Sequence, residues 1–247
     1  MPDIWFPYYR PRPQARLRLF CFHYAGGGAA VFRSWSEMLP AQIDICALQL
    51  PGHESRLTED LITDFPQLIE KLLPAFLPYL DMPYAFFGHS LGAGISFELA
   101  RTLNKSGHQL PVHLFVSGRR GPQVERRDPL TYNLPDPEFI VKLRELEGTP
   151  EEVLQHRELL EILLPVIRAD FTLSETYTYQ AQPLLSCPLS AYGGLQDNDV
   201  TRADLAAWQL ETSGPFVQRM FPGNHFFLNS ARANLLQILK QELLAHL

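Results

Sequence analysis

The stretch GHSLG, residues 88–92, matches the pattern G-x-S-x-G that surrounds the nucleophilic serine of many hydrolases. An apolar run at residues 84–87 precedes it and a helical pattern follows at once, which places Ser90 on a predicted strand-to-helix turn. Flanking glycines permit the tight backbone that lifts such a serine hydroxyl clear of the sheet. Leu91 opens the helix, so its N–H is predicted to point toward the oxygen that becomes negative during attack.

A serine hydroxyl is a poor nucleophile until a base takes its proton, and hydrolases with this turn carry the acid and the base after later strands. Asp197 lies in AYGGLQDNDV just past one predicted strand, and His225 lies in FPGNHFF just past the next. We predict His225 as general base and then general acid, with Asp197 fixing its tautomer and stabilising the imidazolium. Asp199, two residues on, is a competing acid, and Asp170 in a helical segment is a third candidate.

The second donor to the developing oxyanion is predicted in the glycine-rich loop FHYAGGGAA, residues 22–30, which follows an early strand. Its glycines let the backbone approach a substrate closely, and the Ala25 N–H is the candidate. A nucleotide-binding turn is the rival interpretation, but Val31 stands where G-x-G-x-x-G/A needs glycine or alanine. Among the remaining histidines, we expect His23 and His89 to line the pocket.

Short apolar runs alternate with helical patterns in the first half of the chain, which is typical of a mostly parallel sheet covered on both faces. The alternation resumes near residue 187 and continues to the C-terminus. We therefore predict an α/β fold. The predicted strands are 16–24, 43–50, 84–90, 112–118, 187–194 and 216–223, and the predicted helices outside the middle segment include 32–40, 65–80, 91–107 and 234–247.

The middle of the chain, residues 129–183, contains no convincing strand and several helix starts. Asp136-Pro137 and the capping-box pattern that begins at Thr149 each open a helical pattern, and a third pattern follows Pro165. We predict a single domain, residues 1–247, in which this helical insertion forms a lid over the sheet edge where α/β folds bind ligands. The alternative is a structural subdomain without a gating role.

Composition excludes several classes of function. A formal charge of −6 gives no electrostatic support for nucleic-acid binding, so we predict no nucleic-acid partner. Three separated cysteines, Cys21, Cys46 and Cys187, form no CxxC pair, which argues against a disulfide framework or a zinc site and fits a reducing cytoplasm. The N-terminus is broken by Pro and Arg, and no run of about 20 apolar residues exists, so we predict neither a signal peptide nor a membrane partner.

Taken together, the motifs resemble those of type II thioesterases, the stand-alone α/β hydrolases that accompany polyketide synthases and nonribosomal peptide synthetases. The resemblance covers nearly the whole chain and rests on FCFHYAGGGAAVFRSW, LQLPGHESR, FFGHSLGAGISFELA, FVSGRRGP, LPDPEFIVKLRELEGTPEEVL, LLPVIRADFTLSETYTY, GGLQDNDV and FPGNHFFL. It implies the triad Ser90, Asp197 and His225, an oxyanion hole of the Ala25 and Leu91 N–H groups, and a flexible lid over an acyl chamber. A Pro-His or Pro-Tyr pair commonly precedes Ala-Gly-Gly in this family, whereas His23-Tyr24 stands here.

The resemblance also implies the substrate, an acyl group held as a thioester on the phosphopantetheine arm of an acyl or peptidyl carrier protein, removed when stalled or wrongly primed. We expect no metal and no cofactor other than the phosphopantetheine that the substrate carries, and a cytoplasmic enzyme. The alternatives are a general carboxylesterase or lipase with the same triad, a non-catalytic binding module on a hydrolase scaffold, and transfer to an internal nucleophile.

One arginine-rich loop could contribute to binding of a carrier protein. The segment SGRRGPQVERRDP, residues 117–129, carries the arginines Arg119, Arg120, Arg126 and Arg127 near the expected active-site edge. Carrier proteins are usually acidic and the arm carries a phosphodiester, so these arginines are candidates for docking one or the other. The alternative is a solvated loop with internal salt bridges to Glu125 and Asp128.

Overall fold

The computed structural model describes residues 3–247, and its centre is a six-stranded sheet in the order β2-β1-β3-β4-β5-β6, with every neighbouring pair parallel. The predicted α/β fold is confirmed, and all six predicted strands are present with ends shifted by a few residues. The strands are β1 (Leu17–Phe22), β2 (Ile43–Ala47), β3 (Tyr84–His89), β4 (His113–Ser117), β5 (Leu189–Gly194) and β6 (Phe216–Phe221).

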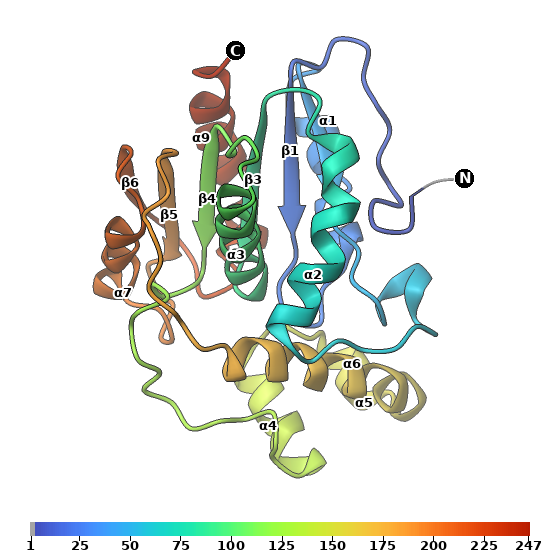
Figure 1. Cartoon of the computed structure of the whole chain (residues 1–247). Coiled ribbons are helices and arrows are strands. Elements are labelled where there is room, and N and C mark those ends of the chain that lie inside the picture. The colour runs from blue at the N-terminus through green and yellow to red at the C-terminus, as the bar shows by residue number, and fades with distance from the viewer. Residues whose placement is uncertain (1–2) are drawn as a thin grey trace.

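Helices cover both faces of this sheet (Figure 1). The α-helices are α1 (Trp35–Met38), α2 (Phe65–Phe76), α3 (Leu91–Lys105), α4 (Asp136–Leu146), α5 (Glu151–Gln155), α6 (Arg157–Thr176), α7 (Arg202–Ala206), α8 (Phe227–Ser230) and α9 (Arg232–Leu244). The 3₁₀ helices are η1 (Ala29–Phe32), η2 (Glu54–Arg56), η3 (Leu77–Tyr79) and η4 (Ala207–Glu211). The predicted helix at 32–40 is wrong in extent, because η1 and the short α1 occupy that region.

The side-chain alternation of β1 explains why the sheet needs a cover on each face. Phe20 and Phe22 join the core beneath α2 and α3, whereas Leu19 and Cys21 join the core beneath α1 and α9. Every residue of β1 is buried, so neither face of the strand is left to water.

The start of α2 shows how the sequence sets a local boundary. The Asp64 carboxylate accepts a hydrogen bond from the Gln67 N–H (2.9 Å), and Pro66 occupies the first turn, where no N–H is needed. Apolar side chains from Phe65 to Phe76 then recur on one face and pack into the core.

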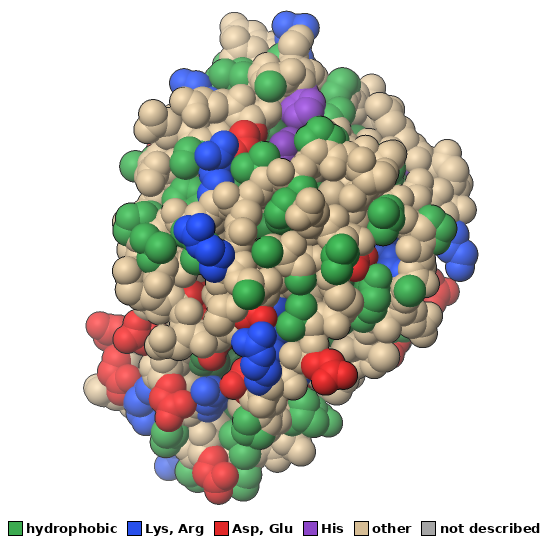
Figure 2. Space-filling model, turned by 90° about the vertical axis from the view of Figure 1, so that its left-hand side faces the viewer, with side chains coloured by type: hydrophobic (Ala, Val, Ile, Leu, Met, Phe, Trp, Pro, Cys, Tyr) green, Lys and Arg blue, Asp and Glu red, His purple; other side chains and the backbone are tan. Residues whose placement is uncertain are grey.

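The segment between β4 and β5 carries α4, α5 and α6, and no strand occurs in it among the described residues. Figure 1 shows these helices below the sheet, at the end to which the strand arrows point. Acidic and basic side chains are intermixed on this lower part of the molecule (Figure 2). The helical insertion is therefore present where the sequence predicts it, and its gating role stays a prediction.

Three local predictions in this insertion are wrong. Helix α6 begins at Arg157, with the His156 side chain accepting from the Leu159 N–H, and runs unbroken through Pro165, so no separate helix follows that proline. No side chain caps α4 or α5, because Pro135 and Pro150 stand at their N-cap positions. Asp136 instead binds the Arg168 guanidinium of α6 (2.6 Å).

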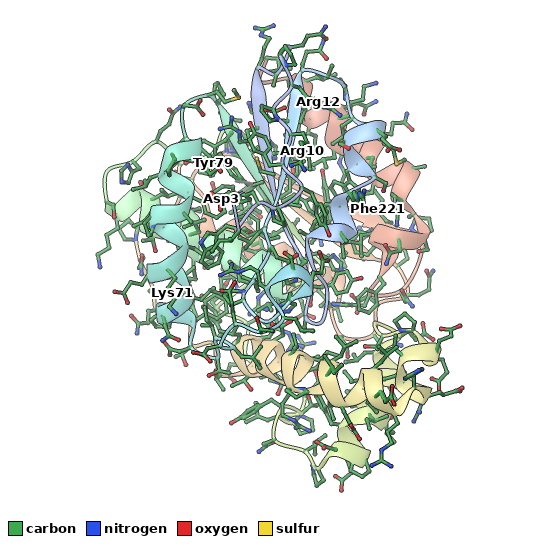
Figure 3. All side chains as sticks on the ribbon, turned by 90° about the vertical axis from the view of Figure 1, so that its right-hand side faces the viewer. Asp3, Arg10, Arg12, Lys71, Tyr79 and Phe221 are labelled. Carbon is green, nitrogen blue, oxygen red and sulfur yellow. The ribbon has the colours of Figure 1, made fainter. Side chains whose placement is uncertain are left out.

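An irregular segment precedes β1 and ties the N-terminal region to α2 and η3. Phe6 is fully buried in the core, and the Tyr79 hydroxyl donates to Asp3 (2.8 Å), as the labelled side chains in Figure 3 illustrate. Among the described residues, no helix has the length and apolar character needed to cross a membrane.

The packing of α3 against β1 generates a stability prediction. A Cβ added to Gly92 would lie 2.1 Å from the carbonyl oxygen of Phe22, and backbone on both sides leaves no room for relaxation. We expect Gly92→Ala to cost about 3 kcal/mol or more in free energy of unfolding, measured by urea denaturation.

Gly107→Ala is the matched control. Gly107 has φ +73° and open space around its Cβ position, so the substitution meets only the left-handed backbone penalty of roughly 1–2 kcal/mol. Equal losses for the two variants would contradict the close approach of α3 to β1.

Candidate active site

Ser90 stands on a strained turn between β3 and α3. Its backbone has φ 54° and ψ −112°, a region that a non-glycine residue occupies at a cost of about 1–3 kcal/mol. The Ser90 N–H donates to the Ser117 carbonyl at the end of β4 (2.7 Å), which holds the turn in place. A Cβ at Gly88 would lie 2.2 Å from the Gly92 carbonyl oxygen, so both glycines of the motif are required by close backbone approach.

Asp197 and His225 meet because the loops after β5 and β6 are bonded to each other. The Leu195 N–H donates to the Phe221 carbonyl (2.8 Å), and the Gln196 N–H donates to the Gly223 carbonyl (2.9 Å). His225 Nδ1 lies 2.8 Å from Asp197 Oδ2, and the Asp197 side chain is fully buried. Because a carboxylate accepts, Nδ1 carries the proton and Nε2 is left free to act as a base.

The structure separates the three candidate acids. The second oxygen of Asp197 accepts from the backbone N–H groups of Asp199 (2.9 Å) and Val200 (3.1 Å), which fixes the carboxylate toward His225. Asp199 lines the cavity that Ser90 and His225 also line, and its side chain makes no hydrogen bond to His225. Asp170 lies on α6 and pairs with His53 instead (2.9 Å). The geometry therefore selects Asp197.

Ser90 and His225 line one cavity of about 590 Å³, together with Ala25. No hydrogen bond joins the Ser90 hydroxyl to His225 within residues 3–247, and contacts of this kind often tighten only when a substrate binds. Leu91 is the first residue of α3 and is buried. The N–H groups of the first helical turn have no carbonyl partner within the helix, and the Leu91 N–H is one of them. In the described part of the chain, neither the Ala25 N–H nor the Leu91 N–H donates a recorded hydrogen bond.

The helical insertion supplies the opposite wall of this cavity. Leu143 and Leu146 of α4 and Ile167 and Phe171 of α6 give it apolar surface. The Thr131 and Tyr132 N–H groups donate to the Glu175 carboxylate, which anchors the start of the insertion to its last helix. The cavity therefore has a polar floor at the sheet edge and an apolar wall contributed by the insertion.

His23 and His89 do not line the cavity, so that expectation is wrong. Both are buried beneath it, where the neutral imidazole is favoured. Burial lowers the pKa of His23 to about 4, and burial beside His225 holds the pKa of His89 below its ordinary value. His89 Nδ1 bonds the Ser117 hydroxyl (2.8 Å), directly under the Ser90 turn.

The four arginines of the 117–129 segment differ in their partners. Arg120 pairs with Asp128 (3.3 Å), Arg126 with Glu175 (2.8 Å) and Arg127 with Asp204 (2.6 Å). Arg119 lines the cavity and, within residues 3–247, has no carboxylate in ion-pair range. Only the Arg120–Asp128 pair is a salt bridge within the segment, as the alternative expected, whereas Arg126 and Arg127 pair with carboxylates of α6 and α7.

Arg119 remains a cation although burial lowers its pKa to about 10. Its Nη1 donates to the Ser174 hydroxyl (3.0 Å) and toward the Ser90 carbonyl (3.5 Å), and its guanidinium lies 5.6 Å from the centre of the Tyr177 ring. A guanidinium has five N–H donors, so unused donors remain beside the reactive serine. The sequence places Arg119 in one cluster with Arg120, Arg126 and Arg127, because a motif does not show which arginines form ion pairs.

The three cysteines are free and buried. Among residues 3–247, no group of three His, Cys, Asp or Glu side chains is arranged to hold a metal ion.

The parallel sheet, the strained serine turn and the insertion after β4 have the architecture of an α/β hydrolase. The model of the thioesterase domain family matches residues 17–243, so the chain belongs to the thioesterase family. It is 44% identical over 239 residues to the gramicidin S biosynthesis protein GrsT of Aneurinibacillus migulanus, covering 97% of this chain and 93% of GrsT.

Two further likenesses bear on function. The protein named linear gramicidin dehydrogenase LgrE, of Brevibacillus parabrevis, is 44% identical, with 100% of this chain and 95% of that protein covered. The solved structure of the type II thioesterase BorB, from the borrelidin biosynthetic cluster, superposes with a TM-score of 0.86 at 36% identity, covering 95% of each chain.

Proposed function

We propose that this thioesterase hydrolyses acyl thioesters from the phosphopantetheine arm of carrier proteins, with Ser90 as nucleophile, and so removes aberrant acyl groups from a polyketide or peptide synthase. The observation that carries the proposal is the His225–Asp197 hydrogen bond of 2.8 Å beside a serine on a strained turn, all at one cavity. The similarity to GrsT and BorB supports the choice of a synthase-bound substrate.

The chemistry follows from the atoms that face the cavity. Ser90 Oγ attacks the thioester carbonyl while His225 Nε2 takes the hydroxyl proton, and Asp197 stabilises the imidazolium that forms. The N–H groups of Ala25 and Leu91 donate to the tetrahedral oxyanion. The C–S bond breaks, the thiol leaves with the proton from His225, and water activated by the same nitrogen then cleaves the acyl-Ser90 ester to release the carboxylic acid.

A dinucleotide-dependent activity, which the name of LgrE would suggest, finds no matching site at the glycine-rich loop after β1 within residues 3–247. The loop after β1 leads into the four-residue helix η1 instead of an α-helix whose N-terminus could receive a pyrophosphate. The space beside Gly28 is also filled, since a Cβ there would lie 2.1 Å from Glu54 Oε1.

The proposed function is tested with acyl groups loaded on a phosphopantetheinylated carrier protein and with p-nitrophenyl esters of the same acyl chains. We expect a higher kcat/KM for the carrier thioester, and loss of both activities together with fluorophosphonate labelling in Ser90→Ala. Faster hydrolysis of the simple esters would favour the carboxylesterase alternative. Absence of labelling in the unmodified protein would favour the binding module.

Substitution of the two neighbouring acids tests the triad. Asp197→Asn removes the acceptor that fixes the His225 tautomer, so kcat should fall by about 10⁴-fold on acyl-carrier protein. Asp199→Asn is the matched control, because that carboxylate has no recorded bond to His225, and its kcat should stay within about threefold. The reverse order of losses would identify Asp199 as the catalytic acid.

We further propose that Arg119, alone among the four arginines, contacts the acyl end of the substrate. Its Nη1 lies 3.5 Å from the backbone carbonyl oxygen of Ser90, at the serine end of the cavity, whereas the phosphodiester lies at the other end of the arm. Arg119 therefore fits an acyl or amide oxygen near the thioester. Phosphodiester contacts are left to Arg120 and Arg126, which also line the cavity, while Arg127 lies outside it.

Arg119→Gln removes a charged donor, which is typically equivalent to about 1.5–3 kcal/mol, so kcat/KM should fall by roughly 10- to 100-fold. Arg127→Gln, half exposed and outside the cavity, is the control and should change kcat/KM less than twofold. The loss at Arg119 should persist with a short acyl-N-acetylcysteamine thioester. A loss confined to the carrier-bound substrate would assign Arg119 to docking instead.

A further inference from the structure

A buried carboxylate on the insertion binds the loop that carries Ala25. Asp170, on α6, accepts a hydrogen bond from the Gly26 N–H at 2.7 Å and is 2% exposed. The two residues are 144 positions apart in sequence. The bonded N–H belongs to the residue directly after the proposed oxyanion donor, so the contact fixes the backbone on the C-terminal side of Ala25.

A second contact from α6 acts on the same glycine. Gly26 has φ +75°, a conformation that favours glycine, and a Cβ there would lie 3.1 Å from the Ile167 side chain. Ile167 and Asp170 stand three residues apart, on one face of α6. Helix α6 therefore packs on Gly26 and binds its backbone at once.

The peptide unit that contains the Ala25 N–H is held from its other end. Its carbonyl group, the Tyr24 C=O, lies 2.9 Å from His23 Nδ1 and also accepts from the Gly27 N–H (2.9 Å). A carbonyl oxygen only accepts, so His23 carries its proton on Nδ1. Donation to the carbonyl polarises the peptide and strengthens its N–H as a donor.

His53 links these groups into one cluster. Its Nδ1 faces the Pro51 carbonyl (3.0 Å) and its Nε2 faces the Asp170 carboxylate (2.9 Å). Both nitrogens face acceptors, so the ring is protonated on each and forms a buried ion pair with Asp170. Its ring centre lies 4.9 Å from that of His23. Burial alone would lower the pKa of His53, but the Asp170 carboxylate outweighs that effect and raises it.

We infer that Asp170 is a positioning residue for the oxyanion hole: with His53 behind it, it holds the 25–26 backbone so that the Ala25 N–H faces the carbonyl attacked by Ser90. This inference rests on the proposed function. It also gives α6 a part in transition-state stabilisation in addition to its place in the cavity wall.

The test compares transition-state binding with ground-state binding. In Asp170→Ala the Gly26 N–H loses its acceptor, and a displacement near 1 Å of a catalytic group costs about 10²-fold. We expect kcat on acyl-carrier protein to fall by roughly 10- to 100-fold while KM changes less than threefold. Calorimetry should show a similar loss of affinity for an alkyl boronic acid, whose tetrahedral adduct places an oxygen in the oxyanion hole.

Affinity for an alkyl-pantetheine thioether, which lacks the thioester carbonyl that would enter the oxyanion hole, should be unchanged in the same variant. Asp170→Asn should restore most of kcat, because the Gly26 N–H and His53 Nε2 both contact the same oxygen, Oδ2, and an amide oxygen in its place still accepts from both. A purely structural role for Asp170 would lower the unfolding temperature without this selective loss of boronate affinity. If Asp170→Ala does not fold, Asp170→Ser, which is too short to reach Gly26, replaces it.

Asp44→Ala is the matched control. Asp44 is equally buried and also accepts one backbone N–H, from Arg12 (2.9 Å), and one side-chain donor, the Tyr9 hydroxyl (3.0 Å), but it lies at the start of β2, away from the cavity. Its kcat and boronate affinity should match those of the unmodified protein. Equal losses in Asp44→Ala and Asp170→Ala, or a boronate affinity in Asp170→Ala within twofold of the unmodified protein, would overturn the inference.

Measurements on the unmodified protein distinguish failure of the proposed function from failure of the positioning role of Asp170. If it neither hydrolyses acyl-carrier thioesters nor binds the boronic acid, the proposed function fails. If it does both and Asp170→Ala does the same, only the positioning role fails.

Discussion

The close approach of the first turn of α3 to the end of β1 is the constraint on which the site depends. Gly92 lies so near the Phe22 carbonyl that no side chain fits between them. This contact brings the N-terminus of α3, with the Leu91 N–H, beside the loop that carries Ala25. The two proposed oxyanion donors come from segments more than sixty residues apart in sequence, and this backbone packing brings the two segments together. The strain at Ser90 is tolerated because the surrounding sheet and helix leave its turn no alternative.

Parallel strand order supplies the rest of the site. Strands β1, β3, β4, β5 and β6 are consecutive neighbours, so the loops at their carboxyl ends form one row. Ser90 follows β3, Asp197 follows β5 and His225 follows β6, and the insertion after β4 has room only over the same edge. The fold thus explains why a nucleophile, its base and an apolar wall converge although they lie far apart in the sequence.

Local patterns predict the six strands, the serine turn and the order of acid and base, because each depends on residues adjacent in sequence. They fail where distant residues compete. Pro165 reads as a boundary, yet α6 continues through it because the helix is held by packing and by Arg168 bonds to the 132–136 segment. Asp170 resembles a spare catalytic acid until its partners, His53 and Gly26, are known, and those lie 117 and 144 residues away. Nor does the motif distinguish Arg119 from its three ion-paired neighbours.

The pKa values of two neighbouring histidines, His23 and His53, shift in opposite directions. This contrast explains how an internal polar cluster can serve the oxyanion loop. Burial lowers the pKa of His23 to about 4, so this ring is neutral, whereas the bonded Asp170 carboxylate raises the pKa of His53. The neutral ring donates to the Tyr24 carbonyl, and the His53 ring orients the carboxylate that binds Gly26. Each ring thus acts on one side of the Ala25 N–H without touching the cavity. A loop that must leave one N–H unbonded needs its neighbouring groups satisfied elsewhere, and α6 provides that acceptor from within the insertion.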